Sequence, residues 1–241
     1  MNLSLPFVGR EKEMSRLRQL QQQRRPVLLL GAEGVGKSAL VEQWRKPLGL
    51  HVCPASEHLS EICDALEHSL GLEAGGFDLV KRKNRLLRLL RETKRAVVDF
   101  DNASWTTPKL GSFIENVSRC VPVWLCVRSE HPWDIGRIWP LLVRFEHVEL
   151  KPFHPRETQK LVASAVGKKI VPEKTLEIVG WLHHRSAGCP KILCELLTEI
   201  AHGHYDLGNP HGLRLLDLDR HIHEMFPVTS FDRKMPANNC H

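Results

Sequence analysis

The residues best suited to chemistry lie in one glycine-rich segment, GAEGVGKS at positions 31–38. Its glycines, lysine and serine have the spacing that is typical of a phosphate-binding loop, or P-loop. Glycines at these positions let successive backbone N–H groups point toward phosphate oxygens. Lys37 would then reach the β- and γ-phosphates, and Ser38 would offer its hydroxyl to Mg²⁺. The residues expected to contact a nucleotide here are Glu33, Gly34, Val35, Gly36, Lys37, Ser38 and Ala39.

The segments on either side of this loop must position it. Val27–Leu30 is a short apolar run that predicts a buried parallel strand, and residues 39–44 have the pattern of a helix. A helix that begins at this point would add the partial positive charge of its N-terminus to the phosphate site. A simple glycine turn is the alternative, and the strand–loop–helix context disfavours it.

The bulk composition bounds the size and setting of the protein. The 241 residues are 42% hydrophobic and 26% charged, which suits a main domain with a second, smaller one. No apolar run is long enough to cross a bilayer, no signal peptide is apparent, and the seven cysteines form no C-x-x-C pair. We therefore expect a cytoplasmic protein with reduced thiols and no membrane partner. The net charge of +6 permits an acidic partner such as nucleic acid.

A second motif precedes the loop. The sequence FVGRE at positions 7–11 resembles the "hhGRE" signature of AAA+-related ATPases, especially the STAND signal-transduction group and the archaeal and mobile-element ATPases near it. The resemblance implies that Val8, Gly9 and Arg10 help to hold adenine, so that the nucleotide is ATP or ADP. From the residues alone, the alternative is an N-terminal helix with a solvated, charged face.

Acidic residues follow a third apolar run. The stretch Ala96–Trp105 is similar to the metal-binding Walker B strand of these ATPases, and the resemblance places Asp101 at the Mg²⁺ position. On a strand, Asp99 would point to the same side two residues deeper, so it stays a second candidate metal partner. In these families an acidic residue usually stands directly after the metal-binding aspartate, and this chain has Asn102 at that position. Because an amide cannot accept a proton from water, we expect any hydrolysis to be slow.

Two arginines are further candidates for the reaction. Arg128 ends the apolar run Val121–Val127, and it resembles the sensor 1 arginine of STAND proteins, which contacts the γ-phosphate. Arg144 lies in LLVRF at positions 141–145, which resembles the AAA+ segment that carries an arginine finger. That resemblance implies an ATP-dependent homo-oligomer in which Arg144 completes the site of a neighbouring subunit. The alternative for Arg128 is an arginine that caps a strand at the surface.

A basic helix is predicted over Lys81–Arg95. Four of its eight basic residues recur at helical spacing, namely Lys81, Arg85, Arg88 and Arg95. Such a stripe could neutralise the phosphates of DNA or RNA. The alternative is the solvated outer face of a helix that covers a sheet, and the absence of interleaved aromatic residues favours this alternative.

The pattern changes to helices alone after Pro152. Helices are predicted over Pro155–Val166, Pro172–His184 and Pro190–His202, each with proline near its start. The sequence Gly188-Cys189-Pro190 resembles the GxP motif of the STAND lid, which implies that Pro190 contacts the nucleotide. A further helix is expected over Gly212–Phe226, followed by a flexible tail.

The predicted fold is therefore an α/β P-loop NTPase core of AAA+ type, with a mainly parallel sheet and a C-terminal helical lid. The predicted domains are residues 1–152, 153–205 and 206–241. ATP or ADP with Mg²⁺ would bind at the carboxyl ends of the strands. Three functions remain open at this point: an AAA+-like motor or loader on nucleic acid, a STAND-like signalling switch, and a nucleotide-binding module that does not hydrolyse ATP.

Overall fold

The chain divides into two compact units. The computed structural model describes residues 5–48, 50–54, 58–72, 78–93, 96–101, 103, 106–128, 131–203 and 205–225. One unit runs from Arg10 to Pro152, and the other contains Phe153 onward together with the residues up to Gly9. The first unit ends at Pro152, and the segment that ends at Gly9 groups with the second unit. The predicted domain bounds, 1–152, 153–205 and 206–241, stay predictions.

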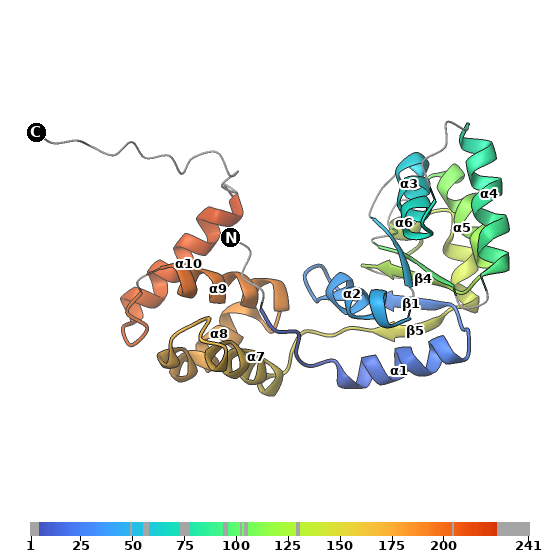
Figure 1. The fold of residues 1–241 in the computed structure, drawn as a ribbon. Coiled ribbons are helices and arrows are strands. Elements are labelled where there is room, and N and C mark those ends of the chain that lie inside the picture. The colour runs from blue at the N-terminus through green and yellow to red at the C-terminus, as the bar shows by residue number, and fades with distance from the viewer. Residues whose placement is uncertain are drawn as a thin grey trace, which may run out of the picture. The chain divides into compact units, whose positions relative to one another are not determined.

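The first unit is built on a parallel sheet (Figure 1). Its strands within the described residues are β1 (Val27–Leu30), β2 (Leu50–Cys53), β3 (Val97–Phe100), β4 (Val123–Val127) and β5 (Glu146–Glu149). Their order across the sheet is β2-β3-β4-β1-β5, and every neighbouring pair is parallel. The carboxyl ends of all five strands therefore lie at one edge of the sheet.

Helices cover both faces of this sheet. Side chains alternate along β1, so that Leu28 and Leu30 enter one hydrophobic cluster and Val27 and Leu29 enter another. The first cluster is completed by α3 (Leu59–Ser69), α4 (Leu79–Glu92) and α5 (Pro108–Ser118), and the second by α1 (Glu11–Gln22) and α2 (Lys37–Leu48). Two short helices, α6 (Pro132–Ile135) and η1 (Trp139–Arg144), precede β5. This three-layer arrangement confirms the predicted α/β fold class.

Some predicted boundaries shift. The basic helix α4 begins at Leu79, because the side chain of Asp78 caps it by accepting the backbone N–H of Lys81 at 2.8 Å. It ends at Glu92, and the predicted stripe residue Arg95 lies outside the described residues. β4 begins at Val123, two residues into the apolar run Val121–Val127.

The second unit is helical. It contains α7 (Pro155–Gly167), η2 (Glu173–Ile178), α8 (Val179–Ser186), α9 (Pro190–His202) and α10 (Pro210–Met225), so the predicted helix Pro172–His184 is two consecutive helices. Their apolar faces form one cluster around residues such as Leu182, Leu193 and Leu216. Val8 packs against this cluster, which explains why the segment that ends at Gly9 groups with these helices.

Position 188 requires a glycine. It has φ +71°, and a Cβ added there would lie 2.3 Å from the carbonyl oxygen of Phe153. The backbone N–H of Phe153 donates to the carbonyl of Gly188 at 2.7 Å. A close approach of two backbone segments therefore fixes the glycine of the Gly188-Cys189-Pro190 sequence.

Within the described residues, no helix has the length and apolar character that a membrane span needs.

Candidate phosphate-binding site

The P-loop connects β1 to α2, as the sequence predicts. Gly34 and Gly36 have φ +76° and +96°, a region that residues with a Cβ rarely adopt. A Cβ on Gly31 would lie 2.7 Å from the carbonyl oxygen of Leu150, so this glycine permits the loop to pass close to the chain after β5. The backbone of the loop therefore depends on its glycines for both conformation and space.

Lys37 lies over this loop at the first position of α2. Its ammonium donates to the carbonyl oxygens of Gly31 at 2.6 Å and Ala32 at 3.0 Å. Burial lowers the pKa of Lys37, and the positive charge of Arg128 acts in the same direction. A partly desolvated cation is thus held at the mouth of the loop, where an anion would interact with it strongly.

Ser38 and Asp101 meet beside Lys37. The hydroxyl of Ser38 donates to Oδ2 of Asp101 at 2.8 Å. These residues come from the start of α2 and the end of β3, and β4 lies between β3 and β1 in the sheet. A hydroxyl and a carboxylate are oxygen ligands of the kind that Mg²⁺ prefers, so the residues present fit a magnesium ion.

Asp99 occupies a different environment from Asp101. Its side chain is fully buried, Oδ1 accepts a hydrogen bond from the thiol of Cys126 at 3.5 Å, and Oδ2 has no partner among the described residues. Burial raises the pKa of Asp99, and the negative charge of Asp101 acts in the same direction. The geometry therefore favours Asp101 over Asp99 as a metal partner.

Arg128 reaches the loop from β4. Leu30 is in register with Val127, so the residues after these two strands emerge side by side. The guanidinium of Arg128 lies 3.1 Å from the carboxylate of Glu33, and these side chains are 52% and 62% exposed. Arg128 also borders a cavity of about 680 Å³ that is lined by Leu30, Gly31, Ala32, Arg128, His147, Glu149, Leu150, Lys151 and Pro152.

Arg10 supports the loop from the N-terminal segment. Its guanidinium donates to the carbonyls of Val35 at 3.0 Å and Lys151 at 2.7 Å, and also to Glu13 at 3.2 Å. The side chain is only 4% exposed, so these bonds join the P-loop to the segment after β5 in a buried setting. Sequence reasoning missed Lys151, because a backbone acceptor leaves no signal in the sequence.

The other predicted nucleotide contacts belong to the second unit. Val8 and Gly9 group with its helices, and Pro190 lies in the first turn of α9. Their contact with the nucleotide stays a prediction. Asn102 and Trp105 lie outside the described residues.

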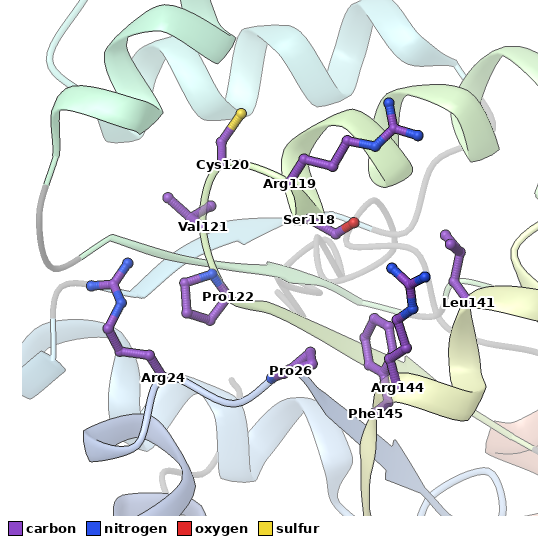
Figure 2. Close-up of a pocket in the computed structure, with 10 residues that line it drawn as sticks. All are labelled: Arg24, Pro26, Ser118, Arg119, Cys120, Val121, Pro122, Leu141, Arg144 and Phe145. Carbon is purple, nitrogen blue, oxygen red and sulfur yellow. The ribbon is translucent and has the colours of Figure 1, made fainter.

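Arg144 lies at the opposite edge of the sheet. Figure 2 shows it beside Phe145, across a cavity of about 370 Å³ from Arg24. The cavity is also lined by Pro26 and Pro122, which directly precede β1 and β4. Strands of four or five residues, at about 3.3 Å per residue, separate this edge from the P-loop by roughly 13–16 Å. Within one chain, Arg144 therefore does not reach the phosphate site.

The basic helix α4 presents a smaller stripe than the sequence suggests. Arg82 donates to both carboxylate oxygens of Glu67, which is buried, and it also pairs with Asp64. Lys81 and Arg88 are exposed, and Arg85 is partly exposed. The outward charge of α4 within its described residues thus comes mainly from these three side chains, Arg91 and the partly exposed Lys83.

Comparisons with known proteins agree with this geometry. The sequence model of the AAA ATPase domain matches residues 6–124. No curated protein matches the chain. Among solved structures, the Orc1 protein of Aeropyrum pernix, determined in complex with DNA, is 15% identical with a TM-score of 0.63, over 89% of this chain and 66% of that one.

Two further structures are similar. Cdc6p of Pyrobaculum aerophilum is 13% identical with a TM-score of 0.63, over 84% of this chain and 63% of that one. A STAND protein of Pyrococcus horikoshii with a tetratricopeptide repeat sensor is 17% identical with a TM-score of 0.54, over 90% of this chain and 33% of that one. The chain thus spans slightly less than two thirds of the Orc1 and Cdc6p chains that it matches.

Proposed function

We propose that this chain, which is an AAA+-related P-loop ATPase, binds ATP or ADP with Mg²⁺ and acts as a nucleotide-dependent switch. The observation that carries the proposal is the hydrogen bond of 2.8 Å between Ser38 and Asp101, with the ammonium of Lys37 beside it. A hydroxyl, a carboxylate and a lysine at a glycine loop are the groups that a Mg²⁺–nucleotide complex needs.

Each of these residues has a separate role in the proposal. The backbone of the P-loop binds the phosphates, and Lys37 neutralises charge on the β- and γ-phosphates. Ser38 and Asp101 hold Mg²⁺, which supplies further neutralisation of phosphate charge when it is bound. Arg128 contacts the γ-phosphate. Because Asn102 cannot accept a proton from water, we expect binding to be easier to detect than turnover.

The switch would act through the second unit. The predicted contacts of Val8 and Gly9 with adenine, and of Pro190 with the nucleotide, would form when nucleotide binds and would be lost when it leaves. A ligand shifts a conformational equilibrium only by its differential affinity for the two states, and these contacts would supply that difference. STAND-like signalling and nucleotide binding without hydrolysis are variants of this proposal that differ in output.

The test is calorimetric titration of Mg²⁺–ATP and Mg²⁺–ADP into the wild type and four variants. Lys37→Ala should lower the affinity for both nucleotides at least tenfold, a loss of about 1.4 kcal/mol or more of binding free energy. Lys12→Ala, an exposed lysine on α1, is the matched control and should bind as the wild type does. Asp101→Asn should lose the Mg²⁺-dependent part of the affinity, whereas Asp99→Asn should keep it. Wild-type protein that binds neither nucleotide would refute the proposal.

A nucleic acid partner is favoured by the charge of α4. Lys81, Arg85 and Arg88 lie on one helical face, away from the buried Leu86 and Leu90. Cations on one face of a helix suit the phosphates of DNA or RNA. The similar Orc1 chain was determined in complex with DNA, which supports testing DNA first.

A further inference from the structure

Glu33 and Arg128 form an ion pair directly at the mouth of the P-loop. Leu30 pairs with Val127 across the sheet, so Glu33 and Arg128 leave neighbouring strands at the same edge. The distance between the guanidinium Nη1 of Arg128 and Oε2 of Glu33 is 3.1 Å. The acid therefore comes from the phosphate-binding loop itself, and the arginine is the residue assigned to the γ-phosphate.

The carboxylate of Glu33 lies in a site whose other charged groups suit the binding of a Mg²⁺–nucleotide complex. The loop carries Lys37, whose ammonium also lies near Asp101 and Arg128. Asp101 bonds to Ser38, so its negative charge is directed at the proposed metal position. Glu33 adds a negative charge to a site that has to accept phosphates, and Arg128 lies within ion-pair distance of that charge.

ATP and ADP place different demands on this pair. The proposed contacts of the loop backbone and Lys37 include the phosphates that ATP and ADP share. The contact with Arg128 requires the γ-phosphate, which ATP alone carries. When Arg128 turns to the γ-phosphate, its ion pair with Glu33 is broken, and the carboxylate of Glu33 loses that attraction as a further anion enters the site.

We propose that Glu33 makes the nucleotide site favour ADP over ATP, because it holds Arg128 in an ion pair that the γ-phosphate must displace. Glu33 is thus a specificity residue that acts through Arg128. The inference rests on the proposed nucleotide-binding function. A chain with this pair would rest with ADP bound, and ATP would have to exceed ADP in concentration or gain contacts elsewhere to replace it.

The test compares the Kd of ADP with the Kd of a non-hydrolysable ATP analogue, both with Mg²⁺, by calorimetry. Glu33→Gln keeps the shape of the side chain and removes its charge. It should shift the ratio of the affinities toward the ATP analogue by about two- to fivefold, the range that a solvent-exposed ion pair supports. Glu42→Gln is the matched control, because Glu42 is also exposed and pairs with an arginine, Arg45, at 3.6 Å. It should leave the ratio unchanged.

The role of Arg128 is tested by repeating the comparison in the Arg128→Ala background. If Glu33 acts by holding Arg128, Glu33→Gln should no longer change the ratio there. An equal change in both backgrounds would mean that Glu33 only repels phosphate, and would overturn the proposal. An unchanged ratio in the Glu33→Gln single variant would overturn it as well.

Failure of the proposed function has a different signature. If the wild type binds neither nucleotide, or binds both as Lys37→Ala does, the nucleotide site itself is wrong and this inference falls with it. If the wild type binds through Lys37 and Glu33→Gln leaves the ratio unchanged, only the inference about Glu33 is refuted.

Discussion

Asp99 and Asp101 lie two residues apart, yet they are suited to different roles. Asp101 follows β3 and accepts a hydrogen bond from Ser38, whereas Asp99 is fully buried beside Cys126. A buried carboxyl without a cationic partner favours its neutral form, because the ionised form would lose its hydration. Asp99 thus favours the protonated carboxyl, whereas Asp101 supplies the carboxylate charge that a metal ion needs.

This difference predicts how stability depends on pH. The folded chain holds the proton of Asp99 to a higher pH than the unfolded chain, in which such a carboxyl has a pKa near 3.8. The contribution of Asp99 to the free energy of unfolding is complete below its pKa in the unfolded chain, and it is lost as pH rises through its higher pKa in the folded chain. The free energy of unfolding then falls by up to about 1.4 kcal/mol per pH unit. Asp99→Asn cannot ionise, so its free energy of unfolding should fall less as pH rises.

Guanidinium denaturation at several pH values between about 5 and about 8, with EDTA present, measures this difference. EDTA removes divalent cations whose charge would favour the ionised form of Asp99. Glu42→Gln, which neutralises an exposed carboxylate, should follow the wild type. Identical pH slopes for the wild type and Asp99→Asn would contradict the expectation.

At the scale of elements, α4 distributes its charge over distinct faces. Leu86 and Leu90 are buried against the sheet, and Arg82 is bound to the buried Glu67 of α3. Removing one partner of such a pair leaves a buried charge, so Arg82 is part of the packing. Lys81 is 73% exposed, and it lies with Arg85 and Arg88 on the remaining face.

Replacing Lys81, Arg85 and Arg88 together by alanine should therefore weaken DNA binding without unfolding α4. Each phosphate contact that is lost should lower the slope of log affinity against log salt by about 0.9. Fluorescence anisotropy with a labelled duplex at several salt concentrations measures this slope. Arg45→Ala and Arg119→Ala remove exposed cations from α2 and the end of α5, and they should leave the slope unchanged. A triple variant with the wild-type slope would exclude α4 as the interface.

At the scale of the whole molecule, the position of Arg144 requires a second copy for any role in catalysis. Arg144 lies where β5 begins, whereas Ser38, Asp101 and Arg128 lie at the carboxyl edge of the sheet. A finger at one edge and a phosphate site at the other suit a head-to-tail assembly, in which each copy completes its neighbour's site.

A mixing experiment tests this arrangement. Lys37→Ala should fail to bind ATP, and Arg144→Ala should bind ATP but turn it over poorly. In an equimolar mixture that exchanges subunits, about one interface in four joins an intact nucleotide site to an intact finger, so turnover should recover to about a quarter of the wild-type rate. Particle size measured by light scattering with ATP shows whether assembly occurs. Full activity of the Arg144→Ala variant alone would rule out a role for Arg144 as an arginine finger.

The sequence by itself determined the features that depend on near neighbours in the chain. The strand Val27–Leu30 and the helix Pro190–His202 were predicted to the residue, because apolar period, proline and flanking breaks are local signals. The P-loop followed from its spacing alone. The class of fold then followed from the order of strands and helices, since parallel strands need helical connections.

The tertiary structure alone decided which distant residues meet. The contact of Ser38 with Asp101 spans 63 positions and that of Arg10 with Lys151 spans 141, and no local pattern encodes either. A strand's period of two places Asp99 and Asp101 on one side, but their depth depends on the elements that cover β3. The pairing of Glu33 with Arg128 has the same origin, because strand order in a sheet is set by packing across its faces and not by order along the chain.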